Sequence, residues 1–227
     1  FRRVLFRSKY HLQVCVVGHV GDGNIHPQVA LNLENDDEFK NYISAKTEIY
    51  ELATSLGGTI SAEHGVGSEG TLAVVVEAEL KLIPKPETTR VVTAYFDKIE
   101  NATSAVTEIM RASVFPATID FMDNNSIVTV EKFYPCGLDT TKNAMLLIEL
   151  DGFEASMPTQ QERVEMALYK ADASKIETKI SQDEQEAVWT ARRASFAATT
   201  KLAPDVVCDE LRQQYLLELI LNYFHLK

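Results

Sequence analysis

The chain has 227 residues, of which 45% are hydrophobic and 24% are charged, with a formal net charge of −11. This composition is typical of a globular domain and excludes a mainly disordered chain. The acidic balance makes nucleic acid a poor partner, because a phosphate backbone would be repelled. No apolar window approaches the roughly 18 uninterrupted residues that span a bilayer.

The number and spacing of the cysteines indicate whether the protein works in an oxidising or a reducing compartment. Cys15, Cys136 and Cys208 are far apart in the sequence and odd in number. This usage argues against a disulfide framework and favours a reducing cytoplasm. The first residues are basic but lack the apolar region and cleavage site of a signal peptide. Residues 1–8 also show no pattern that would pair them with the rest of the fold, and we expect them to be an extraneous leader.

The first third of the chain predicts two strands, a helix and a third strand. Strands are expected at 13–19 and 25–33, and a third at 59–65. Between them, apolar spacing predicts a helix from Asp36 to Leu56, capped at its start by Asn35 or Asp36 and ended by the glycine pair that follows.

The rest of the chain repeats a strand–helix pattern. In order, we expect a strand at 90–97, a helix at 98–113, a strand at 117–123, a short helix at 125–133, a strand at 144–153, a helix at 158–170, a strand at 174–181 and a helix at 183–202. This succession predicts an α+β fold, with an antiparallel or mixed sheet, flanking helices and ferredoxin-like βαβ units.

The motif GHVGDGNIH (18–26) is the strongest local signal for chemistry. A loop of six residues (20–25) would join two strands and place His19 and His26 nearly opposite each other across the mouth of a hairpin. Two imidazoles so placed can share a divalent cation, and Glu63 or His64 could supply a third ligand. The alternative is a plain turn with two hydrogen-bonded surface histidines.

Two further motifs have simpler alternatives. GVGSEG (65–70) matches the dinucleotide fingerprint, but the residues after it predict a strand instead of the helix that must face the pyrophosphate, so we reject a Rossmann site. Arg192, within WTARR, could clamp a carboxylate with its planar guanidinium. The alternative for Arg192 is a surface salt bridge.

Together, GHVGDGNIHP, GGTISAEHGVG, GSEGTLAVVVEAELKLIPKP, LLIELDG and WTARR resemble one family. It comprises FAD-linked oxidases of 2-hydroxy acids: the flavin subunit of glycolate oxidase, cytochrome-type D-lactate dehydrogenase and D-2-hydroxyglutarate dehydrogenase. The resemblance covers residues 9–210. It implies the FAD-linked oxidase C-terminal cap domain and oxidation of a D-2-hydroxy acid, with FAD taking the hydride.

The resemblance also implies roles for individual residues. His19, His26 and Glu63 would bind a divalent metal (zinc, with manganese or iron as alternatives) that holds the substrate and acidifies its hydroxyl. His64 would be the general base, and Arg192 would bind the substrate carboxylate. The flavin would lie against a segment made of Gly67, Ser68, Glu69, Gly70, Thr71 and Leu72. Gln28 replaces an asparagine found in some relatives.

The order of the motifs departs from the family. We expect residues 9–67 to be the C-terminal part of the substrate domain and 88–210 its N-terminal part. Residues 68–87 would be a remnant of the FAD domain, and 211–227 an unrelated apolar tail. The chain would then be circularly permuted or misassembled, and most of the FAD domain would be missing.

The implied partners are a small 2-hydroxy acid and an electron acceptor, either an iron–sulfur subunit, an electron-transfer flavoprotein or a quinone. The location would be cytoplasmic, with peripheral membrane association through partner subunits. Two other interpretations stay open at this point: a non-catalytic metal-binding module, and a chimeric translation without function.

Overall fold

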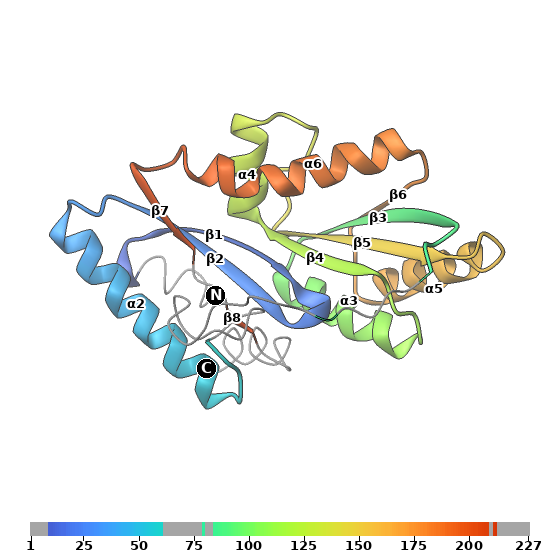
Figure 1. Cartoon of the computed structure of the whole chain (residues 1–227), viewed down its shortest axis with the longest axis horizontal. Coiled ribbons are helices and arrows are strands. Elements are labelled where there is room, and N and C mark those ends of the chain that lie inside the picture. Colours follow the sequence, from blue (N-terminus) through green and yellow to red (C-terminus); the bar gives the residue numbers. More distant parts are fainter. Residues whose placement is uncertain (1–8, 61–78, 80–83, 209–210, 213–227) are drawn as a thin grey trace.

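The computed structural model describes residues 9–60, 79, 84–208 and 211–212. One sheet runs through this part of the chain, with helices on both of its faces (Figure 1). The strands are β1 (Gln13–His19), β2 (Asn24–Leu31), β3 (Thr88–Phe96), β4 (Thr118–Asp123), β5 (Ala144–Gly152), β6 (Lys175–Lys179), β7 (Asp205–Cys208) and β8 (Leu211–Arg212). The helices are η1 (Val20–Asp22), α2 (Asp36–Ser55), α3 (Ile99–Arg111), α4 (Asn124–Phe133), α5 (Met157–Lys170) and α6 (Gln182–Thr199). No helix among these residues is long and apolar enough to cross a membrane.

The strand order is β6-β3-β5-β4-β1-β2-β7, with β8 paired to β2, and each recorded pairing is antiparallel. Within it, β3-α3-β4 and β5-α5-β6 form two strand–helix–strand units whose strands interleave as β6-β3-β5-β4. This is the ferredoxin-like arrangement, with α4 inserted between the units. The α+β fold predicted from the sequence is therefore confirmed, and its sheet is antiparallel in every recorded pairing.

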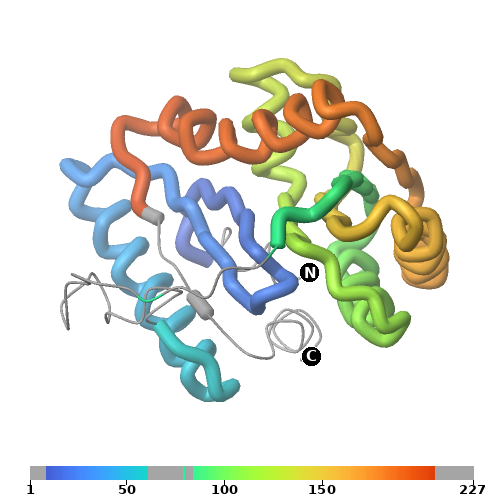
Figure 2. The backbone as a smooth tube through the Cα atoms, turned by 45° about the vertical axis from the view of Figure 1, so that its right-hand side comes forward, coloured from blue at the N-terminus to red at the C-terminus, as the bar shows by residue number. Residues whose placement is uncertain are grey.

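The sheet separates two layers of helices. Figure 1 shows α4 and α6 on one face and α2, α3 and α5 on the other, and Figure 2 shows α6 passing over the β1–β2 segment. Side chains alternate between the faces of each strand, so apolar cores form on both faces, and a further cluster packs β2 against α2. The core under α4 and α6 includes Val17, Met122, Ile127, Val130, Met145, Leu147, Ala191 and Ala198. The opposite core, against α3 and α5, includes Phe96, Val106, Ile109, Phe121, Leu146, Ile148, Val164 and Leu168.

The helix ends follow their capping residues. Asn35 accepts hydrogen bonds from the backbone N–H groups of Asp37 and Glu38 and starts α2 as the sequence predicts. Ser181 and Glu184 form a reciprocal capping box at the start of α6. Asp123 caps α4 by accepting from the N–H of Ser126.

The hairpin differs from its sequence prediction. Its connection runs from Val20 to Gly23 and is shorter than six residues, because η1 turns tightly and Gly23 closes it with φ 71°. The strands then pair Val17 with His26, so His19 lies diagonally from His26 instead of opposite it. The strand predicted at 59–65 extends beyond the described residues.

The hairpin joins the ferredoxin-like unit through one seam. Strand β1 pairs with β4, and in this register His19 lies opposite Asp120. Residues separated by 101 positions in the sequence therefore become direct cross-strand neighbours. This seam forms one wall of the site described next.

Candidate functional site

His19 and His26 lie together at the end of the hairpin, on the sheet face covered by α4 and α6. Their ring centroids are 5.3 Å apart and the rings are nearly perpendicular, at 83°. The side chain of His19 is 39% exposed, whereas His26 as a residue is only 8% exposed. The pair therefore has one solvent-accessible and one buried imidazole, at a separation that suits a shared ligand.

A buried carboxylate stands beside this pair. Asp120 on β4 is 2% exposed, and its Oδ1 lies 2.5 Å from Nδ1 of His19. An ionised carboxylate only accepts hydrogen bonds, so the Nδ1–H of His19 donates to it. Its second oxygen, Oδ2, lies 2.7 Å from Nε of Arg192 and forms an ion pair.

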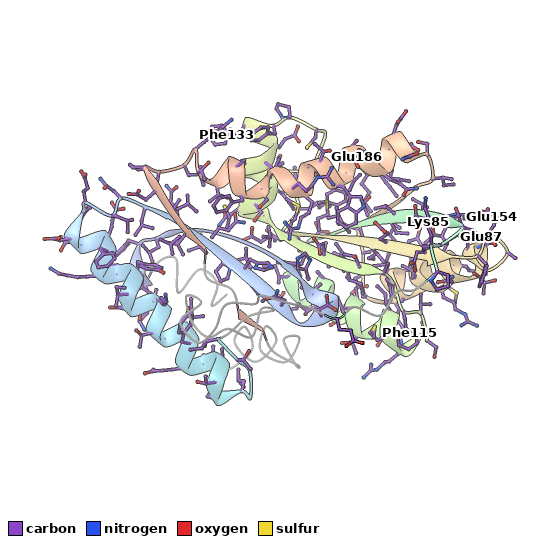
Figure 3. The ribbon with its side chains drawn as sticks, viewed as in Figure 1. Lys85, Glu87, Phe115, Phe133, Glu154 and Glu186 are labelled. Carbon is purple, nitrogen blue, oxygen red and sulfur yellow. The ribbon has the colours of Figure 1, made fainter. Side chains whose placement is uncertain are left out.

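Arg192 reaches the site from α6 and is the inward member of an arginine pair. Its side chain is only 13% exposed. The adjacent Arg193 instead pairs with Glu186 of the same helix, and both side chains are more than half exposed. Figure 3 labels Glu186 on α6. The surface-salt-bridge alternative therefore describes Arg193, and Arg192 lies over the sheet.

One helical turn before Arg192, Trp189 lies close to a second acidic group of the same face, although its indole Nε1 makes no aligned hydrogen bond within the described residues. Burial raises the pKa of Glu149 on β5 above its ordinary value, the contact with the Trp189 indole opposes this shift, and the charge of Asp151 reinforces it. The α6 face of the sheet thus carries carboxylates on the neighbouring strands β4 and β5, each in contact with a residue of α6.

Gln28 fixes α6 to β2. Its Oε1 accepts a hydrogen bond from the Thr199 hydroxyl at 2.8 Å and lies 3.5 Å from the Ser195 hydroxyl. All three residues are at most 3% exposed. Gln28, which stands where some relatives have asparagine, is therefore engaged by α6 through its carbonyl oxygen.

The structure brings together three of the residues singled out from the sequence: His19, His26 and Arg192. The others, Glu63, His64 and the segment 67–72, lie outside the described residues. Within the described part of the chain, no group of three or more His, Cys, Asp or Glu side chains is arranged to hold a metal. The two histidines nevertheless fit such a site, because a carboxylate on Nδ1 leaves Nε2 as the coordinating atom.

Sequence reasoning missed Asp120. It lies within PATIDFMD, between Ile119 and Phe121, so it is a charged residue at an inward position of a buried strand. A charge is rarely fully buried without a partner, and this was the available signal. The identity of its partners depends on the β1–β4 pairing, which no local pattern reveals.

Residues 5–73 and 85–211 match the family model described as FAD linked oxidases, C-terminal domain. The glycolate oxidase subunit GlcD of Bacillus subtilis is 35% identical over 160 residues, covering 70% of this chain and 34% of that protein. The same subunit of Escherichia coli is 40% identical over 144 residues, covering 63% of this chain and 28% of that protein. A D-lactate dehydrogenase of Anaerostipes hadrus is 28% identical over 129 residues, covering 50% of this chain and 27% of that protein. The chain thus spans about a third or less of these relatives.

Proposed function

The chain belongs to the family of FAD linked oxidases, C-terminal domain, and from this membership we propose that it forms the substrate-binding part of an oxidoreductase. The substrate would be a D-2-hydroxy acid of the glycolate or D-lactate type, and the product the 2-oxo acid. The relatives named as glycolate oxidase subunits and D-lactate dehydrogenase support this class of reaction.

The observation that carries the proposal is the position of Arg192 beside the histidine pair. A 2-hydroxy acid offers a carboxylate and an adjacent hydroxyl, which require a fixed cation and a second polar group nearby. Asp120 contacts the guanidinium at Nε, and no hydrogen bond of Nη1 or Nη2 is recorded within the described residues. The side of the guanidinium formed by Nη1 and Nη2 therefore suits bidentate binding of a substrate carboxylate.

The histidines bind and orient the other end of the substrate. His19 and His26, with Glu63, would hold a divalent metal, for which zinc, manganese and iron are candidates. When bound, FAD supplies the two-electron oxidant and the metal supplies Lewis-acid polarisation of the hydroxyl. Burial of His26 and Asp120 keeps these two groups away from bulk water, which strengthens their electrostatic contacts, whereas solvent reaches His19.

The remaining assignments are part of the same proposal. His64 would take the hydroxyl proton, and Gly67 to Leu72 would lie against the flavin. Residues 9–67 and 88–210 would be the two parts of the substrate domain, joined through a remnant of the FAD domain at 68–87. The interruption of the family match between residues 73 and 85 falls in that segment and supports this division. An iron–sulfur subunit, an electron-transfer flavoprotein or a quinone would accept the electrons, and a cytoplasmic location stays a prediction.

Calorimetric titration of the full chain, saturated with Zn²⁺, against glycolate and D-lactate tests the proposal. We expect Arg192→Lys to weaken binding of the acid roughly 10- to 100-fold, since a charged hydrogen bond contributes about 1.5–3 kcal/mol. Arg193→Lys is the matched control and should bind like the wild type. Failure of the wild type to bind either acid, or equal losses in both variants, would contradict the proposal. Zn²⁺ binding without binding of either acid would favour the metal-binding module.

A further inference from the structure

Asp120 contacts two different elements of the candidate site with its two oxygens. Oδ1 faces Nδ1 of His19 on β1, and Oδ2 faces Nε of Arg192 on α6. The carboxylate belongs to neither the proposed metal ligands nor the proposed carboxylate-binding group. It lies between them and is buried, with 3% of its side chain exposed.

The surroundings of Asp120 hold it rigidly. It sits on β4 between β1 and β5, opposite His19 on one side and Leu147 on the other. The flanking strands and the core under α4 and α6 leave its side chain little freedom, because close-packed interiors restrict rotamers. A carboxylate fixed in this way defines the orientation of any donor that contacts it.

The contact with His19 has a specific chemical consequence. A neutral imidazole carries one proton, and acceptance of the Nδ1–H by Oδ1 selects the tautomer whose Nε2 bears a lone pair. That lone pair is what a metal ligand requires. The ion pair with Arg192 places Nε of the guanidinium 2.7 Å from Oδ2 of Asp120, so charge attraction holds the arginine beside the carboxylate although its Nε–H is not aligned for a hydrogen bond.

We propose that Asp120 is a positioning residue that couples metal binding at His19 to carboxylate binding at Arg192. The inference rests on the proposed function, because it assigns roles to the same two partners. One carboxylate sets the tautomer of the histidine and the direction of the arginine together. Loss of this single group should therefore weaken two affinities that involve different ligands.

Asp120→Asn is the variant that separates this role from simple packing. The amide has nearly the same shape, but it has only one acceptor oxygen and carries an N–H₂ group. It can accept from His19 or from Arg192, and its N–H₂ then faces a donor on the other side. Asp123→Asn is the matched control: Asp123 is a fully buried residue of the same strand, and Asn is an equally good helix N-cap.

The experiment measures Zn²⁺ affinity of the full chain by chelator competition and glycolate affinity at saturating Zn²⁺. Loss of an outer carboxylate on a metal-bound histidine typically weakens metal binding about 10- to 100-fold. We expect that loss in Asp120→Asn, together with weaker glycolate binding. Arg192→Lys should weaken glycolate binding alone, and Asp123→Asn neither affinity. Wild-type values for both ligands in a folded Asp120→Asn would overturn the inference.

The tautomer of His19 provides a readout that needs no ligand. Long-range ¹H–¹⁵N spectra of the metal-free wild type at alkaline pH should show the Nδ1–H form, and Asp120→Asn should shift His19 towards the Nε2–H form. An Nε2–H tautomer in the wild type would overturn the inference even if the variant failed to fold. If the wild type bound neither Zn²⁺ nor glycolate, the proposed function and the coupling role of Asp120 would both fail. If the wild type bound both ligands and Asp120→Asn bound them equally well, only the inference about Asp120 would fail.

Discussion

The Thr199 hydroxyl near the end of α6 donates a 2.8 Å hydrogen bond to Oε1 of Gln28 on β2, and both residues are almost completely buried. The same hydroxyl lies 2.9 Å from the backbone oxygen of Ser195, one turn earlier. Together with the Asp120–Arg192 ion pair, this bond fixes α6 to the sheet at two places.

We predict that Thr199→Val destabilises the chain by about 1–3 kcal/mol, because the buried Gln28 oxygen loses its shorter hydrogen bond. Urea unfolding followed by circular dichroism measures the change. Thr200→Val is the control, since Thr200 is exposed and its hydroxyl bonds only to the backbone oxygen of Ala197 within the recorded contacts. Equal stabilities of the two variants would show that the Gln28 contact contributes nothing.

A second prediction concerns the hairpin. A Cβ added at Gly18 would lie 2.9 Å from Cα of Ile25 and would collide with the backbone oxygen of Asn24. We expect Gly18→Ala to cost about 1–3 kcal/mol through forced backbone movement, and to disturb the approach of His19 to His26. A Cβ at Gly21 would meet the Ile119 side chain at 3.4 Å and the Ile119 backbone nitrogen at 3.6 Å, both ordinary contact distances. Gly21→Ala should therefore keep the stability of the wild type in thermal unfolding, and similar losses in both variants would refute the steric argument.

A third prediction uses the single tryptophan of the chain. Because burial raises the pKa of Glu149, the fluorescence of Trp189 should titrate with a midpoint above 4.5, the ordinary value for this group. The raised pKa also means that the ionised carboxylate opposes folding: its contribution to stability is present below the ordinary pKa and is lost as the pH rises through the folded pKa. Glu149→Gln should therefore abolish the fluorescence titration and be more stable than the wild type at pH 7.

The control for that measurement is Glu186→Gln, on the exposed side of α6. It should leave the fluorescence midpoint of Trp189 where it is in the wild type. A midpoint at or below the ordinary glutamate value in the wild type would refute the assignment.

A fourth prediction concerns the reactivity of Cys136. Cys136 is an exposed residue, but partial desolvation of its thiol, followed by the charge of Glu131 and its contact with the thiol, raises the pKa of Cys136 to about 11. At pH 8 only about 0.1% of such a thiol is ionised, so alkylation by iodoacetamide should be much slower than for an ordinary cysteine. Peptide mass spectrometry measures the rate at this residue alone.

Glu131→Gln removes the negative charge and should speed the alkylation of Cys136, although partial desolvation still holds the pKa of the thiol above its usual range. Asp139→Asn, a change of the same kind in the neighbouring loop, should alter the rate little. Rapid labelling of the wild type at pH 8 would contradict the raised pKa.

Much of the fold was predictable because its signals are local. The alternation in QVCVVGH, the Asn35 cap and the Ser181–Glu184 box each lie within a few residues of the element that they specify. The proximity of His19 and His26 also follows from a short hairpin, although their diagonal offset depends on the tight turn at Gly23.

The rest of the site depends on contacts distant in the sequence. Asp120 meets His19 only because β1 pairs with β4, and it meets Arg192 only because α6 packs over that seam. Helical periodicity alone does not determine which of Arg192 and Arg193 points inward, since both positions flank the apolar stripe. The inward direction is set by the buried carboxylate below, and Gln28 is likewise held by partners more than 160 positions away.

Because the β1–β4 seam joins strands that are remote along the chain, the cluster at its end exists only after the whole sheet has closed. Closing so long a loop has an entropic cost, and a chain in which β1 and β4 are not paired has no assembled site. A ligand that binds this cluster therefore selects the fully closed sheet and raises the midpoint of thermal unfolding with its concentration. Occupancy of the site therefore reports that β1, β2, β4 and α6 have come together.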